Sequence, residues 1–194
     1  MYELRVNVTK IMGTCTADPP MKRGDYFTVN DGAIRIPPGG FVCLWALNNL
    51  LPLIPSKERE ILEDKEDDWM WRVHHVQCPN PGSRIIWRLE QRPLGSTKVE
   101  SHHTIQAQSG DLQLSVCEVL GKCTSGMKKG DFAIARNGLL YLPQPFCLWP
   151  LQTAIPRLLS MQQPGYSTNV GPCAYEKLIC PDPSGNVVLQ IERV

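Results

Sequence analysis

The sequence contains one series of motifs twice, and this repetition constrains the fold more than any other feature. Each copy carries, in the same order, Gly-x-Cys, Met-Lys-[Arg/Lys]-Gly-Asp, Cys-Leu-Trp and Cys-Pro-[Asn/Asp]-Pro. The motifs begin at residues 13, 21, 43 and 78 in the first copy and at residues 121, 127, 147 and 180 in the second. Motifs that recur in one order across both halves of a chain indicate a tandem duplication.

The pattern within each copy predicts an α+β fold. Each copy is expected to form a small β-β-(β)-α-β unit, with leucines at helical spacing over residues 44–53 and 148–159. Asp31-Gly32 and Asn137-Gly138 lie between extended segments and predict type I′ hairpin turns. Because one such unit buries little surface alone, the two copies are expected to pack with pseudo-twofold symmetry.

The domain boundaries follow from the ends of the repeated motifs. We assign residues 1–92 to the first unit, residues 93–110 to a polar linker and residues 111–194 to the second unit. The first unit carries a highly charged insert at residues 56–68 that has no counterpart in the second. The run of charges predicts a short solvated helix there, and the insert could serve docking of a protein partner or homo-oligomer formation.

Charge and hydropathy exclude two classes of partner. A net charge of +1 argues against binding of nucleic acid, which requires a basic face. No apolar run approaches the roughly 18–20 residues that cross a membrane, so no membrane partner is expected. The first eight residues alternate like a strand and do not resemble a signal peptide, so we expect a cytoplasmic protein.

Eight cysteines are many for a protein in a reducing compartment, and six of them belong to the repeat. They lie at predicted ends of elements, where loops often carry functional sites. Such cysteines could ligate an iron–sulfur cluster or zinc, or react as thiolates. The candidate metal ligands are Cys15, Cys43, Cys78, Cys123, Cys147 and Cys180.

Two of the six cysteines are also candidate nucleophiles. Cys43 and Cys147 lie at predicted helix starts, where the helix dipole favours the thiolate. Trp45 and Trp149 follow two residues later and could line a pocket, although packing in the core is the simpler role for a tryptophan. Motifs of nucleotide-binding loops, serine hydrolases and zinc proteases do not occur, so any chemistry is expected to be cysteine chemistry.

A fourth metal ligand does not repeat with the three cysteines. Cys173 could serve in the second copy, and His74 or His75 in the first, but neither has a counterpart in the other copy. Close Cys-x-x-Cys pairs, which most zinc ribbons and ferredoxins contain, do not occur. The histidine pairs at 74–75 and 102–103 fit a surface location better, and Cys117 fits a packed thiol.

The motif set resembles an uncharacterised family of small, mostly prokaryotic proteins. The resemblance rests on Gly-x-Cys, Gly-Asp, Cys-Leu-Trp and Cys-Pro-Asp-Pro, and it covers both halves but not the linker. Many members are a single unit, so this chain resembles a tandem version of them. The resemblance implies no activity, substrate or cofactor.

Three functions therefore remain open. The leading hypothesis is a cysteine-motif protein that binds a metal or iron–sulfur centre and has a redox or accessory role. The first alternative is a thiol-dependent enzyme that uses Cys43 or Cys147 as nucleophile. The second is a non-catalytic binding or assembly module whose cysteines are buried and structural.

Overall fold

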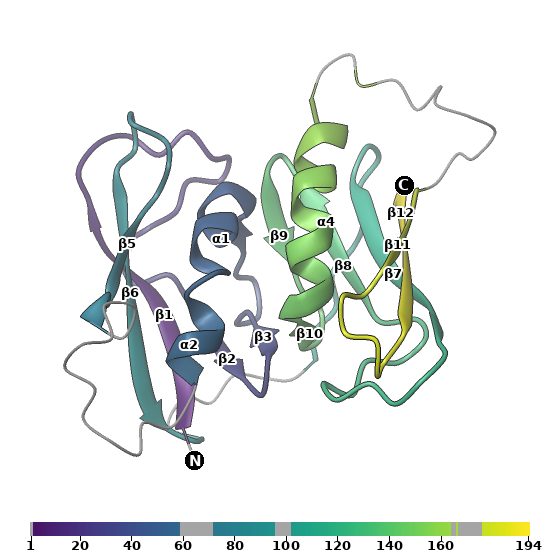
Figure 1. The fold of residues 1–194 in the computed structure, drawn as a ribbon. Helices are drawn as coiled ribbons and strands as arrows, with labels where there is room; N and C mark the ends of the chain where they lie inside the picture. Colours follow the sequence, from purple (N-terminus) through teal and green to yellow (C-terminus); the bar gives the residue numbers. More distant parts are fainter. Residues whose placement is uncertain (1, 59–71, 96–101, 164–165, 167–175) are drawn as a thin grey trace.

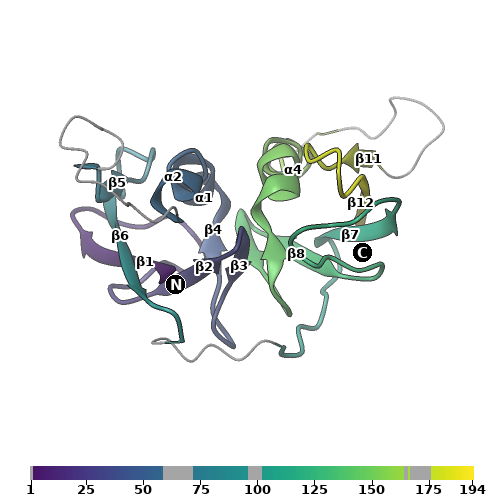
Figure 2. The same ribbon diagram turned by 60° about the horizontal axis from the view of Figure 1, so that its bottom comes forward.

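The chain forms two six-stranded antiparallel sheets with helices packed on one side of each (Figures 1 and 2). The computed structural model describes residues 2–58, 72–95, 102–163, 166 and 176–194. The α+β fold class predicted from the sequence is confirmed. In Figure 2 the helices of the two halves lie on the same side of the molecule, above their sheets, and α1 contacts α4.

The described elements follow one order in the two halves. The first half contains β1 (Tyr2–Ile11), β2 (Tyr26–Asn30), β3 (Ala33–Arg35), β4 (Val42–Cys43), α1 (Leu44–Leu50), α2 (Ile54–Glu58), β5 (His75–Gln77) and β6 (Ile85–Pro93). The second half contains β7 (Leu112–Val119), β8 (Phe132–Arg136), β9 (Leu139–Tyr141), β10 (Phe146–Cys147), α4 (Leu148–Met161), β11 (Glu176–Ile179) and β12 (Val187–Arg193).

The two halves exchange one short strand each. One sheet has the order β10-β3-β2-β1-β6-β5 and the other has the order β11-β12-β7-β8-β9-β4. Thus β4, from the first half, pairs with β9, and β10, from the second half, pairs with β3. The sequence did not predict this exchange, and it means that the two predicted units are interlocked rather than merely adjacent.

Hydrogen bonds from the helix starts extend the exchange beyond the paired strands. The backbone N–H of Leu44 donates to the carbonyl of Gly138 at 2.8 Å, and that of Leu148 donates to the carbonyl of Gly32 at 2.8 Å. Both glycines belong to the predicted hairpin turns, whose central residues have positive φ angles of 50° and 69° at Asp31-Gly32 and of 49° and 76° at Asn137-Gly138. The turn prediction is therefore confirmed, and each turn also holds the helix start of the other half.

The core lies between the inner face of each sheet and its helices. In β1 and β7, buried residues alternate with more exposed ones, as expected when one face of an antiparallel sheet is covered. The indole of Trp87 on β6 is 1% exposed and lies 6.0 Å from the ring of Phe27, measured between centroids. Helix α4 buries Leu151, Ile155 and Leu158 against the second sheet.

The helix of the first half and the charged insert differ from their predictions. The helix predicted over residues 44–53 ends at Leu50, because Pro52 lacks the N–H that a continuing helix needs, and a second helix, α2, begins at Ile54. Lys57, expected in a solvated run, is 2% exposed, since α2 packs on β1, β2 and β6. Residues 59–68 of the insert lie outside the described residues.

The segment predicted as a linker begins inside a strand. Strand β6 extends to Pro93, and residues 102–110 run along the second half, where the N–H of His103 donates to the carbonyl of Pro143 at 2.8 Å. Residues 96–101 lie outside the described residues. In the described part of the chain, no helix combines the length and the apolar character that crossing a membrane would require.

The strand exchange predicts cooperative unfolding of the two halves. Phe146 on β10 is fully buried and pairs with Ile34 in the other sheet. We expect Phe146→Ala to lower the free energy of unfolding by about 3–5 kcal/mol and to shift one single urea transition, read by circular dichroism. The matched control Phe41→Ala truncates a half-buried ring and should cost clearly less. Two separate transitions in the unsubstituted protein would contradict an interlocked fold.

Candidate functional site

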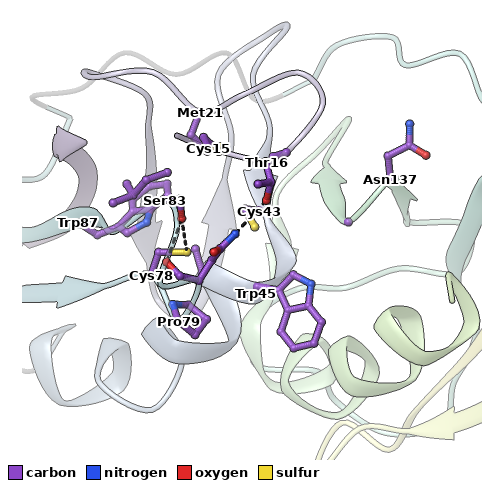
Figure 3. A pocket seen from close by; sticks show the side chains of 15 residues that line it. Cys15, Thr16, Met21, Cys43, Trp45, Cys78, Pro79, Ser83, Trp87 and Asn137 are labelled. Atoms are coloured by element: carbon purple, nitrogen blue, oxygen red, sulfur yellow. Dashed lines mark hydrogen bonds between the residues drawn. The ribbon is translucent and has the colours of Figure 1, made fainter. Parts of the chain in front are cut away.

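The three repeated cysteines of the first half line one cavity (Figure 3). Cys15 lies in the loop after β1, Cys43 ends β4, and Cys78 directly follows β5. The cavity has a volume of about 420 Å³. Three thiols that are 28 and 35 residues apart in sequence therefore face the same space, as predicted for cysteines at the ends of elements.

Backbone contacts hold the Cys15 loop against the turn that follows Cys78. The N–H of Gly13 donates to the carbonyl of Ser83 at 3.1 Å, and the N–H of Thr14 donates to the carbonyl of Gly82 at 3.0 Å. A Cβ atom on Gly13 would lie 1.9 Å from the carbonyl oxygen of Gly82. The glycine of the Gly-x-Cys motif is thus required by the close approach of two backbones.

A side-chain pair adds a second link between the same two segments. The amide of Asn80 donates to the hydroxyl of Thr16 at 2.9 Å, which joins the residue after Cys15 to the second residue after Cys78. The Cys-Pro-Asn-Pro motif therefore supplies both a thiol and the group that holds the neighbouring loop.

The second half repeats these contacts with its own residues. The N–H of Gly121 donates to the carbonyl of Gly185 at 3.0 Å, and a Cβ atom on Gly121 would lie 2.2 Å from the carbonyl oxygen of Ser184. The hydroxyl of Thr124 lies 3.4 Å from Oδ2 of Asp182 and donates to it. The loop of the Gly-x-Cys motif is thus held against the third motif in both halves.

Strand exchange sets the position of the remaining thiol. Cys43 pairs with Leu139 on β9, and the next residue bonds to Gly138 of the same hairpin. Asn137 and Gly138 also line the thiol cavity. The cavity of the first half is therefore completed by the second half.

Burial is the largest influence on the pKa of Cys43. Removal from water raises the pKa of its thiol, and the nearby Cys78 and Cys15 raise it further. The backbone N–H groups of Ala46 and Trp45 donate to the sulfur and oppose the increase only in part. The prediction that the helix start lowers this pKa is therefore wrong, because desolvation outweighs the local N–H groups.

The three thiols of the second half also lie near one another. Burial raises the pKa of Cys147, and the proximity of Cys180 and Cys123 adds to the increase. The hydroxyl of Ser125 forms a 3.1 Å hydrogen bond with its sulfur, which acts in the opposite direction. Burial also raises the pKa of Cys180. The raised pKa of Cys43, Cys147 and Cys180 therefore favours the neutral thiol at these three positions.

The thiols are not arranged around a single ion. Among the described residues, no group of three or more histidine, cysteine, aspartate and glutamate side chains could hold a metal ion as placed. Cys173, the predicted fourth ligand of the second half, lies outside the described residues. His74 and His75 are exposed and do not line the thiol cavity, in agreement with a surface location.

The two tryptophans are half exposed. Trp45 is 50% exposed and Trp149 is 47% exposed, so neither packs in the core. Trp45 lines the thiol cavity, and Figure 3 shows its indole extending toward α4. Cys117 is remote from the cavity and hydrogen-bonds through its sulfur to the side chain of Gln190 at 3.5 Å.

A fourth sulfur also recurs in both halves, and the motif pattern did not predict it as a site residue. Met21 is 3% exposed and lines the thiol cavity (Figure 3). Its counterpart Met127 is 6% exposed, and its sulfur accepts a hydrogen bond of 3.3 Å from the N–H of Cys147. Both methionines open the repeated Met-Lys-[Arg/Lys]-Gly-Asp motif, so the signal was present in the sequence.

Comparisons with known protein families, with curated proteins and with solved structures find no match for this chain. The resemblance to small single-unit proteins that the motifs indicate stays a prediction.

The contact at Gly13 predicts a large effect of a single methyl group. We expect Gly13→Ala to separate the Cys15 loop from the turn after Cys78 and to lower the free energy of unfolding by about 1–3 kcal/mol. Alkylation of Cys78, which is 7% exposed, should become faster in the native protein. The control Thr14→Ala, at an exposed side chain of the same loop, should change neither quantity. Unchanged stability in Gly13→Ala would contradict the assigned contact.

The raised pKa of Cys43 predicts slow alkylation at neutral pH. The rate of its reaction with iodoacetamide should rise with pH through a midpoint above about 8.5, the usual value for a cysteine. Peptide mass spectrometry after timed quenching measures this rate, and the same chain in urea supplies the reference, whose midpoint should return to the usual value. A native midpoint below that of the unfolded chain would instead indicate an activated nucleophile.

Proposed function

We propose that each half binds a thiophilic metal centre through its three repeated cysteines, and that an iron–sulfur cluster is the centre that suits the site best. The observation that carries the proposal is that Cys15, Cys43 and Cys78 line one cavity. Cysteine thiolates are the usual ligands of iron–sulfur clusters, and they also bind zinc.

The protonation of the thiols is compatible with this function. A metal centre displaces protons from its cysteine ligands, so a raised pKa in the metal-free protein does not prevent binding. The N–H groups of Trp45 and Ala46, which donate to the sulfur of Cys43, would then stabilise a bound thiolate. Such hydrogen bonds to sulfur also tune the reduction potential of a cluster.

The size of the cavity favours a cluster over a single ion. The three thiols border about 420 Å³ of space rather than one point, and no three of the described candidate ligands surround an ion position. A cluster contains several iron and sulfide atoms and therefore reaches ligands that stand farther apart. Met21 lines the same cavity and offers a thioether to the position that three cysteines leave open.

The tandem organisation supports one centre per half. We interpret the halves as duplicated units related by pseudo-twofold symmetry, since their elements, motifs and loop contacts follow the same order. Exchange of β4 and β10 makes each site depend on both units. Two centres in one interlocked protein suit a redox or accessory role.

Anaerobic reconstitution tests the proposal. Incubation with ferrous iron and sulfide should produce a brown protein with charge-transfer absorption in the visible region and up to two clusters per chain. Replacement of Cys15, Cys43 and Cys78 by serine should remove one cluster, and the additional replacement of Cys123, Cys147 and Cys180 should remove the other. Iron, sulfide and zinc are measured by elemental and colorimetric analysis of the same samples.

Cys117→Ser is the matched control, because this cysteine lies outside both sets and should not affect metal content. Binding of zinc in place of iron and sulfide would retain the metal site and reject the cluster. A folded chain that binds neither, in every preparation, would leave the cysteines as structural groups and sink the proposal.

A thiol-dependent enzyme is the second candidate, favoured by the shape of the same cavity. Its volume lies within the roughly 300–1,000 Å³ typical of small-molecule sites, and Trp45 offers an aromatic wall beside Cys43. The raised pKa of Cys43 counts against it, because the protonated thiol is a weak nucleophile. The pH profile of alkylation described above therefore separates the two functions.

A further inference from the structure

A second hollow adjoins the thiol cavity and carries a different chemistry. It has a volume of about 470 Å³, and Trp45, Asn137 and Gly138 line both spaces. Two arginines, Arg136 from β8 and Arg193 from β12, line the second hollow only. We call it the arginine hollow.

The guanidinium groups are held in place by the protein. Arg136 donates from Nε and Nη2 to the two carboxylate oxygens of Asp111 at 2.9 and 2.6 Å, and from Nη2 to the carbonyl of Gln106 at 3.0 Å. Arg193 donates from Nη1 to the carbonyl of Gly110 at 3.1 Å and from Nη2 to that of Met161 at 2.7 Å. Both side chains are therefore oriented before any ligand arrives, which lowers the entropic cost of binding.

The hollow keeps a positive charge and free donors after these contacts. Its charged lining residues are Arg136, Arg193 and Asp111, so their sum is one positive charge. A guanidinium has five N–H groups. The described residues accept three hydrogen bonds from the N–H groups of Arg136 and two from those of Arg193. Each arginine therefore retains N–H donors for an anion.

The first half has diverged at the matching positions. The repeat places Asn30 opposite Arg136 in the alignment of the two copies. Gln162 accepts the N–H of Gly138 at 2.9 Å, whereas the carboxylate of Glu58 accepts the N–H of Gly32 at 3.2 Å. The arginine hollow thus has a cation, Arg136, where the first half has an amide. It has an amide, Gln162, where the first half has a carboxylate.

We propose that the arginine hollow binds the carboxylate of a small molecule whose other end reaches past Trp45 to the thiol cavity of Cys15, Cys43 and Cys78. The duplicated halves would then have divided their roles, one supplying these thiols and the other supplying the anion site. The inference deepens the proposed function but does not depend on a metal, because the far end of the ligand meets either free thiols or a centre bound to them.

A pair of thiol reagents tests the inference on the full-length, reduced and metal-free protein. The probes are maleimidohexanoic acid and its uncharged methyl ester, which have the same reactive ring and chain. In both, the thiolate adds to the carbon–carbon double bond of the maleimide, the neighbouring carbon takes a proton from solvent, and no group leaves. The ratio of the two rates at one cysteine cancels its accessibility and pKa, so it reports the carboxylate alone.

We expect the acid to label Cys43 or Cys15 roughly tenfold faster than the ester. This is the ratio that one hydrogen bond to a charged group would give. Cys117, which lines neither space, supplies an internal reference with a ratio near one. Arg193→Gln should bring the ratio at the cavity thiols close to one. Arg88→Gln removes the same charge at a residue that lines neither space and should leave the ratio unchanged.

Ionic strength provides a second readout that requires no substitution. High salt should lower the ratio in the unsubstituted protein, so the proposal stays testable even where Arg193→Gln unfolds the chain. The inference would be overturned by equal rates for acid and ester, or by a ratio that neither Arg193→Gln nor salt changes. It would also be overturned if neither cavity thiol were labelled. A folded chain that binds neither a cluster nor zinc in every reconstitution, but keeps the high ratio, would reject the metal centre and retain the arginine hollow.

Discussion

The pairing of two very short exchanged strands is the constraint on which the rest of the structure depends. β4 and β10 contain two residues each, yet each completes the edge of the sheet formed by the other half. Their hydrogen bonds continue into the helix starts through Leu44 and Leu148. Because each helix begins where its strand ends, the exchange also determines where both helices lie over the sheets (Figure 1).

The candidate site depends on the same strand exchange. Two thiols of the first half come from segments that its own glycine and side-chain contacts hold together, whereas Cys43 stands where the hairpin of the second half places it. The same hairpin contributes Asn137 and Gly138 to both the thiol cavity and the arginine hollow. The first half thus supplies the thiols at this junction, and the second half supplies the arginines.

Local patterns predicted the parts of the fold that local energetics control. Residues that tolerate positive φ identified both hairpin turns, and alternating apolar residues identified the long strands. The two-residue strands and the burial of Lys57 could not be predicted, because neither has a periodic pattern and both arise from packing between distant segments. The predicted lowering of the pKa of Cys43 was wrong for the same reason, since burial is a property of the whole fold.

The sequence by itself determined that one series of motifs occurs twice in the same order, that three cysteines in each series lie at ends of elements, and that both strands and helices are present. Those properties follow from residue order and short-range preferences. Only the tertiary structure decided that the halves interlock, that Met21 joins the cysteines at one cavity, and that Arg136 and Arg193 stand beside Trp45. These depend on long-range backbone hydrogen bonds and on burial, which bring together residues that no spacing along the chain relates.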